Sequence, residues 1–388
     1  MNIFLDPILT TLSVLVSILL VFGFLENYFH KKSLSKIPVR VHVNGTRGKS
    51  SVTRLIAAGL RGGGLRTFAK TTGTTPRIIN ENGKDVEIHR LRSASIGEQV
   101  KLIRYFSNKK PDVLVIECMA VNPQYQWVSE QKIVKSTLGV ITNVRPDHLD
   151  EMGTTNEEIA YSLSNTIPYN SEIITAEYEN FEPLNKVSKK RNSKIFQSDL
   201  KDIDEDYIEK FPFIEHPENL ALALKVCIAL GVNKKDALNG MLSTIPDPGA
   251  LFIWDIKNKK NKCKFISGFA ANDPSSTKMV WNLVSSRFKS KSCIFLNTRN
   301  DRRYRTIQLV DLVLKDIKPD LFIIRADNVS SILNSYEFDK KNIVIFNMDT
   351  EPGLVVQKIL DLNNYFILGI GNIVDWGEQF INRLKEHV

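Results

Sequence analysis

The first part of the chain differs from the rest in its hydrophobic pattern. Residues 7–25 (PILTTLSVLVSILLVFGFL) form one uncharged, mostly apolar run, close to the roughly 20 residues that a helix needs to span a bilayer. The run has no polar face, which a buried amphipathic helix would turn to solvent. No Lys or Arg precedes it, so the basic region of a cleaved signal peptide is missing. Basic residues follow it instead, at His30, Lys31, Lys32, Lys36 and Arg40.

This asymmetry of charge predicts a single-pass membrane anchor. Positive residues gather on the cytoplasmic side of membrane helices, so we expect the N-terminus outside and the catalytic body in the cytoplasm. The remaining chain carries no second run of this kind. We therefore expect residues 1–30 to locate the chain at the cell membrane and to take no part in its chemistry.

Beyond the anchor, apolar runs alternate with helical patterns, which is the order of a parallel α/β sheet. Continuous apolar runs predict strands buried on both faces, at residues 39–43, 113–117 and 138–143. Helical periodicity predicts helices at residues 51–60, 97–110 and 216–230. A second series of predicted strands follows, at residues 264–267, 293–297, 321–325, 343–346 and 365–370.

The break at Asp247-Pro248-Gly249 separates the two series. It predicts three parts: a membrane anchor at 1–30, a central domain at 31–246 and a smaller C-terminal α/β domain at 247–388. The lysine-rich segment 257–264 is most simply a solvated hairpin or loop. Four cysteines without a C-x-x-C pair predict reduced, buried thiols in a cytosolic compartment rather than disulfides or a zinc site.

Composition narrows the range of ligands. With 24% charged residues in 388, the chain is globular rather than disordered. Its net charge of +9 suits acidic ligands such as ATP, polycarboxylates or an anionic membrane surface. No concentrated basic stripe or stacking motif accompanies the charge, so we expect no nucleic acid among the partners.

A glycine-rich loop predicts a site for a nucleoside triphosphate. It lies between the first predicted strand and the first predicted helix, where backbone N–H groups and the helix dipole attract anions. Gly45 and Gly48 let the backbone approach phosphates, Lys49 can reach the β- and γ-phosphates, and Ser50 can hold Mg²⁺. The candidate nucleotide-binding residues are Asn44, Gly45, Thr46, Arg47, Gly48, Lys49, Ser50 and Ser51.

Two further strand ends can complete this chemistry. Glu117 ends the strand at 113–117, where ligands bind in parallel sheets and where a buried carboxylate needs a cation. His148, with Asp147 and Asp150, follows the next apolar strand. Because Mg²⁺ prefers oxygen ligands, we expect Ser50, Glu117 and His148 to hold one or two ions. GTPases and kinases fit less well, since Asn143 is followed by Val144 and no N-K-x-D, H-R-D or D-F-G motif occurs.

At this point the motifs resemble a known family. NGTRGKS, Glu117 after an apolar strand, TNVRPDHLD and HPENLALAL occur in the order found in the Mur ligase superfamily, which includes the folylpolyglutamate synthases. Further motifs are similar to the ligase subunits of poly-γ-glutamate synthases, the PgsB/CapB branch. They are KTTGT at 70–74, ECMAVNP at 117–123, PDPGA at 246–250, GFAAND at 268–273 and GIGN at 369–372.

The resemblance implies an α/β fold with a Mur-ligase-like P-loop central domain, whose sheet is mainly parallel, and a smaller Rossmann-like C-terminal domain. It implies that Lys49 binds the β/γ-phosphates, that Ser50 holds the first Mg²⁺, and that Glu117 and His148 serve a second metal. Asn219 matches an Asn on the adenine side of the family's site. The chain departs from the wider family at four positions. His216 replaces an earlier Asn on the adenine side, and Ala250 replaces an Arg. Leu163 falls near the place of a carbamylated Lys, and Phe269 falls near the place of a ribose-binding Asp.

The resemblance also implies the reaction, in which ATP drives the joining of glutamate through γ-carboxyl linkages by way of an acyl phosphate. Partners would be glutamate, the poly-γ-glutamate chain and other membrane subunits of a synthase complex. Arg47, Arg299 and Arg302 are candidate anion clamps, with surface ion pairs as the alternative, and Thr72 and Thr74 are candidates for the acyl site. Two other functions stay open: a folylpolyglutamate or Mur-type ligase, and a membrane-tethered ATPase that powers polymer export.

Overall fold

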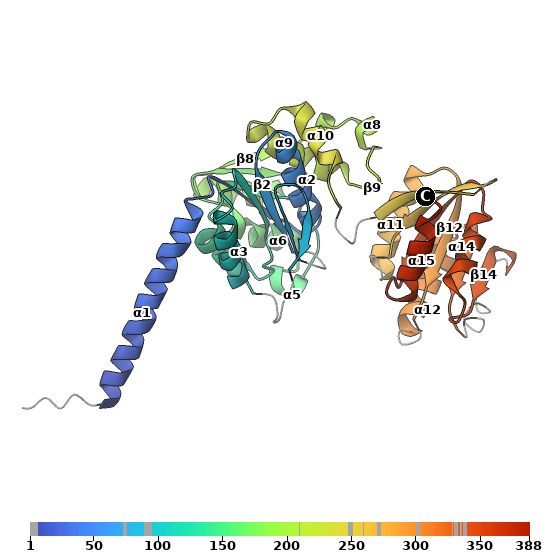
Figure 1. The fold of residues 1–388 in the computed structure, drawn as a ribbon, viewed down its shortest axis with the longest axis horizontal. Coiled ribbons are helices and arrows are strands. Elements are labelled where there is room, and N and C mark those ends of the chain that lie inside the picture. Colours follow the sequence, from blue (N-terminus) through green and yellow to red (C-terminus); the bar gives the residue numbers. More distant parts are fainter. Residues whose placement is uncertain are drawn as a thin grey trace, which may run out of the picture. The chain divides into compact units, whose positions relative to one another are not determined.

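The computed structural model describes residues 7–72, 76–88, 95–208, 210–246, 251–258, 260–269, 273–299, 303–327, 329, 333, 336 and 340–388. The chain divides into two compact units (Figure 1). The central unit comprises Met1–Ile208 and His216–Asp247, and the C-terminal unit comprises Glu209–Glu215 and Pro248–Val388. Residues 209–215 thus belong with the C-terminal unit, although they precede the last helices of the central one.

The central unit is built on an eight-stranded sheet of order β4-β3-β2-β5-β1-β6-β7-β8. From β2 to β8 in this order the strands are parallel, whereas β3 and β4 form an antiparallel edge. The strands are β1 (Val39–Asn44), β2 (Thr67–Thr71), β3 (Arg77–Ile79), β4 (Asp85–Glu87), β5 (Val113–Glu117), β6 (Leu138–Ile141), β7 (Glu172–Thr175) and β8 (Lys194–Gln197).

The central unit also contains helices, most of which flank this sheet (Figure 1). They include α1 (Pro7–Leu34), α2 (Lys49–Gly62), α3 (Gly97–Ser107), α4 (Pro123–Val128), α5 (Leu149–Met152), α6 (Asn156–Leu163), α7 (Phe181–Lys190), α8 (Glu205–Ile208), α9 (Pro217–Ala229) and α10 (Lys234–Leu242). A π-helix, η1 (Ser129–Val134), continues α4. Helix α2 is buried along almost its whole length because it packs against β2, β5, α9 and α10. The helix that follows the phosphate loop is therefore held from several directions.

The C-terminal unit has a seven-stranded sheet of order β14-β13-β12-β15-β11-β10-β9. The five strands from β14 to β11 in this order are parallel, and β10 and β9 add an antiparallel edge. The strands are β9 (Phe213–Ile214), β10 (Leu251–Lys257), β11 (Lys262–Ser267), β12 (Lys291–Asn297), β13 (Leu321–Arg325), β14 (Ile343–Phe346) and β15 (Tyr365–Gly371). Its helices include α11 (Pro274–Arg287), α12 (Arg303–Asp311), α14 (Pro352–Leu360) and α15 (Trp376–Lys385).

Most strands predicted from apolar runs are present, and the expected fold class is confirmed. The lysine-rich segment is the turn of a hairpin, since Lys257 of β10 pairs with Lys262 of β11. All four cysteines are free and buried. Burial raises the pKa of the Cys227 thiol to about 12 and that of Cys263 to about 11, so both stay protonated. The break at 247–249 lies outside the described residues.

Helix α1 joins the apolar run to the body without a break at residue 30. It is long and apolar enough to cross a membrane, and its apolar part is exposed. Its last turns, however, pack on the central unit, where Leu34 joins a core cluster with Ile103 and Phe106 of α3. His30 Nε2 lies 2.8 Å from the carbonyl oxygen of Ile133. The end of this helix is therefore part of the central unit.

A shortened chain tests this packing. A chain that starts at Glu26 keeps these contacts, whereas one that starts at Lys31 loses the hydrogen bond between His30 and Ile133 and the ion pair between Glu26 and Arg104. We expect both to bind ATP and the shorter one to be less stable by about 1–3 kcal/mol, since a buried carbonyl is left unpaired. Denaturant unfolding measures the difference. Equal stability of the two chains would contradict the role of these turns.

Candidate active site

The phosphate loop connects β1, in the middle of the sheet, to α2. Gly45 (φ +135°) and Gly48 (φ +79°) adopt backbone conformations that favour glycine. A Cβ atom on Gly45 would lie 2.0 Å from Thr142 Oγ1, and one on Gly48 would lie 2.6 Å from Asn219 Oδ1. Both glycines are thus required by backbone geometry and by space. Asn219, on α9, lies against this loop.

The loop presents backbone donors and one ammonium group. Helix α2 begins at Lys49, so its first N–H groups and its dipole point toward the loop. Lys49 Nζ donates to the carbonyl oxygens of Gly45 at 2.7 Å and Thr46 at 3.2 Å. Its positive charge therefore lies over the same loop that the N–H groups line.

Ser50 and Glu117, predicted as metal ligands, are in direct contact. Ser50 Oγ donates to Glu117 Oε2 at 2.9 Å, and the backbone N–H of Thr72 donates to the same oxygen at 2.7 Å. Glu117 is 2% exposed. The contact follows from topology, because β5 lies beside β1 and both strands end at this edge of the sheet. Thr72 follows β2, the next neighbour of β5.

A second strand end braces the loop from the other side. After β6, the Asn143 side-chain oxygen accepts hydrogen bonds from Thr46 Oγ1 at 2.8 Å and from the backbone N–H of Arg47 at 3.1 Å. Thr142 Oγ1 donates to the Arg47 carbonyl at 2.6 Å. The phosphate loop is therefore tied to the segment that leads to His148.

Glu177 fixes that segment in turn. Its carboxylate, fully buried, accepts hydrogen bonds from the Val144 backbone N–H at 2.7 Å, from Arg145 Nη1 at 3.1 Å and from the Asn180 backbone N–H at 2.8 Å. Sequence reasoning missed Glu177, Thr142 and Asn143 as parts of the site. Asn143 lay within a recognised motif, but nothing in the pattern of the chain marked Glu177.

His148 lies in the same pocket, with weaker contacts. The pocket has a cavity volume of about 230 Å³ and is lined by Asn44, Gly45, Thr46, Lys49, Thr72, Glu117, Cys118, Met119, Ala120, Val121, Asp147, His148 and Met152. The His148 side chain is 57% exposed, and its Nε2 is 3.9 Å from Asp147 Oδ1. Asp147 is also 3.6 Å from the exposed guanidinium of Arg47. Within the described residues, no three His, Cys, Asp or Glu side chains form a metal-binding group.

A buried ion pair lies behind the phosphate loop, on β1. His42 Nδ1 is 2.7 Å from Glu130 Oε2, and both side chains are buried. Glu130 Oε1 also accepts hydrogen bonds from the backbone N–H and the hydroxyl of Ser136. Burial alone would lower the pKa of His42, but its interactions with Cys118 and Glu130 outweigh this effect and raise that pKa from 6.5 to about 9. The pair ties β1 to the π-helix η1.

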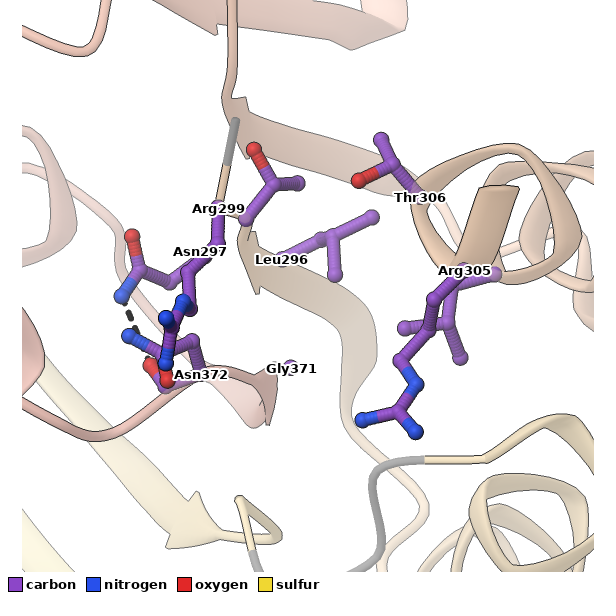
Figure 2. Close-up of a pocket in the computed structure, with 9 residues that line it drawn as sticks. Leu296, Asn297, Arg299, Arg305, Thr306, Gly371 and Asn372 are labelled. Carbon is purple, nitrogen blue, oxygen red and sulfur yellow. Dashed lines mark hydrogen bonds between the residues drawn. The ribbon is translucent and has the colours of Figure 1, made fainter. Parts of the chain in front are cut away.

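The C-terminal unit has its own pocket, at the carboxyl ends of β12 and β15 (Figure 2). Its cavity volume is about 50 Å³, and it is lined by Leu296, Asn297, Thr298, Arg299, Arg305, Thr306, Leu309, Gly371 and Asn372. Asn297 Nδ2 donates to the Asn372 carbonyl at 2.7 Å and its side-chain oxygen accepts from Arg325 Nη1 at 3.0 Å. Figure 2 shows Asn297, Arg299 and Asn372 together and Arg305 apart from them. Two arginine side chains on different sides of this pocket suit a ligand with negative charge.

The remaining predicted residues fall in different places. Arg299 lines the C-terminal pocket, whereas Arg47 lies at the phosphate loop. Thr74, Arg302 and Ala250 lie outside the described residues. Leu163 is fully buried in an apolar cluster with Ile159, so this position holds core rather than a metal ligand. Phe269 is likewise buried, in an apolar cluster of the C-terminal unit.

Each of the two units contains a region that matches a known protein family. The Mur ligase middle domain matches residues 43–226, which contain the phosphate loop and Glu117. The poly-gamma-glutamate synthase CapB C-terminal domain matches residues 253–387, which contain the second pocket. A crystal structure of a bifunctional folylpolyglutamate synthase/dihydrofolate synthase from Yersinia pestis, complexed with AMPPNP and a Mn ion, is similar in fold. Its TM-score is 0.62 at 14% identity, over 93% of this chain and 92% of that one.

The fold and the phosphate loop therefore define the class, which is the ATP-dependent ligases of the Mur type. Two relatives narrow it further. The capsule biosynthesis protein CapB of Bacillus anthracis is 35% identical over 95% of this chain and 81% of its own length. PGA synthase CapB of Bacillus subtilis (strain 168) is 36% identical over 96% of both chains. The chain belongs to the poly-γ-glutamate synthase CapB family, which confirms the resemblance drawn from the motifs.

The pair of His42 and Glu130 predicts a pH dependence of stability. A histidine whose folded pKa is raised stabilises the fold fully below its unfolded pKa of 6.5, and this contribution is lost as the pH rises through about 9. We expect a loss on the order of 3 kcal/mol over this range, which His42→Asn should not show. Chemical unfolding at several pH values measures it, with His387→Asn as the control. A parallel fall in the wild type and in His42→Asn would refute the assignment.

Proposed function

We propose that the chain is an ATP-dependent amide ligase that polymerises glutamate through γ-carboxyl linkages, releasing ADP and phosphate. The observation that carries the proposal is the contact of Ser50 with Glu117 beside a braced phosphate loop, in a chain of the CapB family. A carboxylate of the growing polymer attacks the γ-phosphorus of ATP, and ADP leaves. The amine of the next glutamate then attacks the carbonyl of the acyl phosphate. Phosphate leaves, and the amine proton passes to solvent.

This chemistry needs no protein nucleophile. The polymer carboxylate and the γ-phosphate are both anionic, so their approach requires positive charge and fixed orientation. Lys49, the N–H groups of the loop and the dipole of α2 supply the charge. The hydrogen bonds of Thr46 and Arg47 to Asn143 hold the loop in shape before the substrate binds. Thr72 and Thr74 are proposed for the acyl site.

We propose Mg²⁺ as the ion of this site. The residues fit a divalent cation because Glu117 is a buried carboxylate whose Oε2 accepts only from Ser50 and Thr72 among the hydrogen bonds described. Ser50 and Glu117 would hold the ion, with His148 at a second position. When bound, it neutralises phosphate charge and orients the γ-phosphate. The buried Leu163 supplies no ligand in place of the family's carbamylated lysine.

We further propose that the C-terminal pocket binds the incoming glutamate. Glutamate presents two carboxylates, and Arg299 and Arg305 both line this pocket. Guanidinium groups pair with carboxylates in a bidentate fork. Asn297 and Asn372 add side-chain amides. Arg302, close in sequence to Arg299, is a further candidate for the same role.

The organisation proposed for the whole chain has three parts. Residues 1–30 would anchor it in the cell membrane by a single pass, with the catalytic body in the cytoplasm and other membrane subunits of the synthase beside it. Residues 31–246 would bind ATP, and residues 247–388 would form the C-terminal α/β domain. A folate ligase or a polymer-export ATPase is less well supported, because the C-terminal unit matches the CapB C-terminal domain.

Loss of the loop ammonium tests the ligase function. Lys49→Ala removes the charge near the γ-phosphate, so glutamate-dependent ADP formation should fall by roughly 100-fold or more. The fold should survive, since Lys49 bonds only to carbonyls of its own loop among the contacts described. Lys186→Ala, on α7, is the control. Normal turnover in a folded Lys49→Ala chain would rule out this loop as the ATP site.

Removal of one charge tests the metal site. Glu117→Gln keeps the size of the side chain and an oxygen for Ser50 but removes the charge that attracts Mg²⁺. The Mg²⁺ concentration for half-maximal activity should rise roughly 10- to 100-fold. Activity titrated with MgCl₂ measures this shift, and Glu157→Gln on α6 should leave it unchanged. Superimposable titration curves for wild type and Glu117→Gln would exclude Glu117 as a ligand.

The glutamate pocket has its own test. Arg299→Gln removes one charged donor, so KM for glutamate should rise roughly 10-fold or more while KM for ATP stays the same. Arg303→Gln, on the exposed start of α12, is a matched control. Initial rates of ADP release at varied glutamate give both constants. An unchanged KM for glutamate would show that the amino acid binds elsewhere.

A further inference from the structure

Basic side chains surround the point where α1 joins the central unit. They lie on three elements that contact each other, namely the last turn of α1, helix α3 and the end of η1. We call them the basic collar; its members are Lys31, Lys32, Lys101, Arg104, Lys132 and Lys135. All are exposed except Arg104, which is partly buried. The proposed reaction uses none of these residues.

The collar lies at the level where the apolar run ends. Glu26 is the first charged residue after residues 7–25. Arg104 Nη2 donates to the Glu26 carboxylate at 3.1 Å and to its backbone carbonyl at 3.3 Å. If α1 spans a bilayer, as proposed, Arg104 is at the depth of the lipid headgroups.

Helix α3 turns one face away from the core at this depth. Lys101 and Tyr105 are one turn apart, and Arg104 lies beside them on the helix surface. Tyr105 is 45% exposed. The opposite face, with Ile103 and Phe106, is buried in the core. Helix α3 stands beside α1 (Figure 1). Its exposed face carries polar and aromatic side chains.

The end of η1 contributes the other side of the collar. The hydrogen bond of His30 to the Ile133 carbonyl fixes this turn against α1. Lys132 and Lys135 flank Ile133 in sequence, and both are exposed. On α1 itself, Tyr28 and Phe29 are 54% and 52% exposed. Exposed aromatic and basic side chains together are typical of a membrane–water interface.

We propose that the basic collar binds the headgroups of anionic phospholipids. The proposal rests on the proposed membrane anchor and goes beyond it, because it adds a second contact with the bilayer and a preference for lipid charge. Clusters of four to eight basic residues just inside a membrane helix attract anionic lipids. The contact would add to the packing of α1 on α3 in fixing the tilt of the central unit relative to the membrane.

The anionic polymer is the other acidic partner that this surface could attract. Two observations favour lipid. The members of the collar lie on three elements that meet at the end of the apolar helix, next to the proposed bilayer. The collar also lies beside exposed Tyr28 and Tyr105, whose amphipathic rings suit the headgroup layer better than a chain of carboxylates, and beside the exposed apolar ring of Phe29.

The test compares two full-length variants of equal charge. The collar variant is Lys101→Glu/Lys132→Glu/Lys135→Glu. The control is Lys186→Glu/Lys189→Glu/Lys190→Glu, which changes α7 by the same net charge. Each chain is reconstituted in vesicles of equal phosphatidylcholine and phosphatidylglycerol, and spin-labelled lipids report how much of each class is immobilised. A neutral variant, Lys101→Gln/Lys132→Gln/Lys135→Gln, covers the case in which charge reversal impairs folding.

We expect wild type and control to immobilise phosphatidylglycerol several-fold more than phosphatidylcholine, and the collar variants to lose this selectivity. Equal selectivity in collar variants and control would overturn the proposal. So would unchanged lipid selectivity together with weaker binding of poly-γ-glutamate, which would assign the surface to the polymer. Extraction by alkaline carbonate tests the anchor separately, and glutamate-dependent ADP release tests the ligase. If the wild type stays in the membrane during extraction but shows no lipid selectivity, only the proposal for the basic collar is refuted. If carbonate releases the wild type from the membrane, the proposed anchor is refuted.

Discussion

The site depends on the buried carboxylate of Glu117. An ionised carboxylate with 2% exposure is costly unless donors surround it, and here a hydroxyl from α2 and a backbone N–H from the end of β2 supply them. Both donors belong to elements that pack against β5, namely α2 and β2. The charge of Glu117 is therefore tolerated only while α2 and β2 keep their positions relative to β5. The same charge is what attracts a cation to the phosphate loop. One group thus links the stability of this edge to its chemistry.

Topology explains why the other groups meet there. In the sheet, β1 lies between β5 and β6. The phosphate loop follows β1, so it emerges between the carboxyl ends of β5 and β6, where ligands bind in such sheets. From one side Glu117 contacts Ser50, and from the other Asn143 holds Thr46 and Arg47. Glu177, from the end of β7, secures the second side by binding the backbone of Val144. Three successive strand ends therefore fix a loop that has few contacts of its own.

Much of this arrangement could be predicted from the chain alone. Strands such as β5 and β13 are continuous apolar runs, which the sequence pattern identifies. Parallel strands of one sheet end at the same edge, so the sequence predicted that Ser50, after β1, and Glu117, at the end of β5, belong to one site. Short strands with mixed patterns, such as β3, β4 and β9, were not, because their pairing depends on neighbours distant in the chain. Glu177 escaped for the same reason. Its role comes from the amides that surround it in space, and no spacing along the sequence records them. Residues 209–215 are a further case that the sequence did not predict. They belong to the C-terminal unit because β9 pairs with β10, which lies about 40 residues later in the chain.

Helix α3 shows that parts separate in sequence are not separate in structure. Arg104 of this helix holds Glu26 of α1, while Glu98 in its first turn lies 3.5 Å from the buried ammonium of Lys70, at the end of β2. Residues 98 and 104 are about 9 Å apart along the helix axis. Gln99, fully buried, reaches the Glu117 carbonyl at 3.5 Å and accepts a hydrogen bond from Ser129 Oγ at 2.7 Å. A displacement of α1 relative to the sheet would therefore strain contacts next to Glu117, because one short helix carries both sets. That residues 1–30 locate the chain and take no part in its chemistry stays a prediction, but Glu26 and His30 of this segment are structural parts of the central unit.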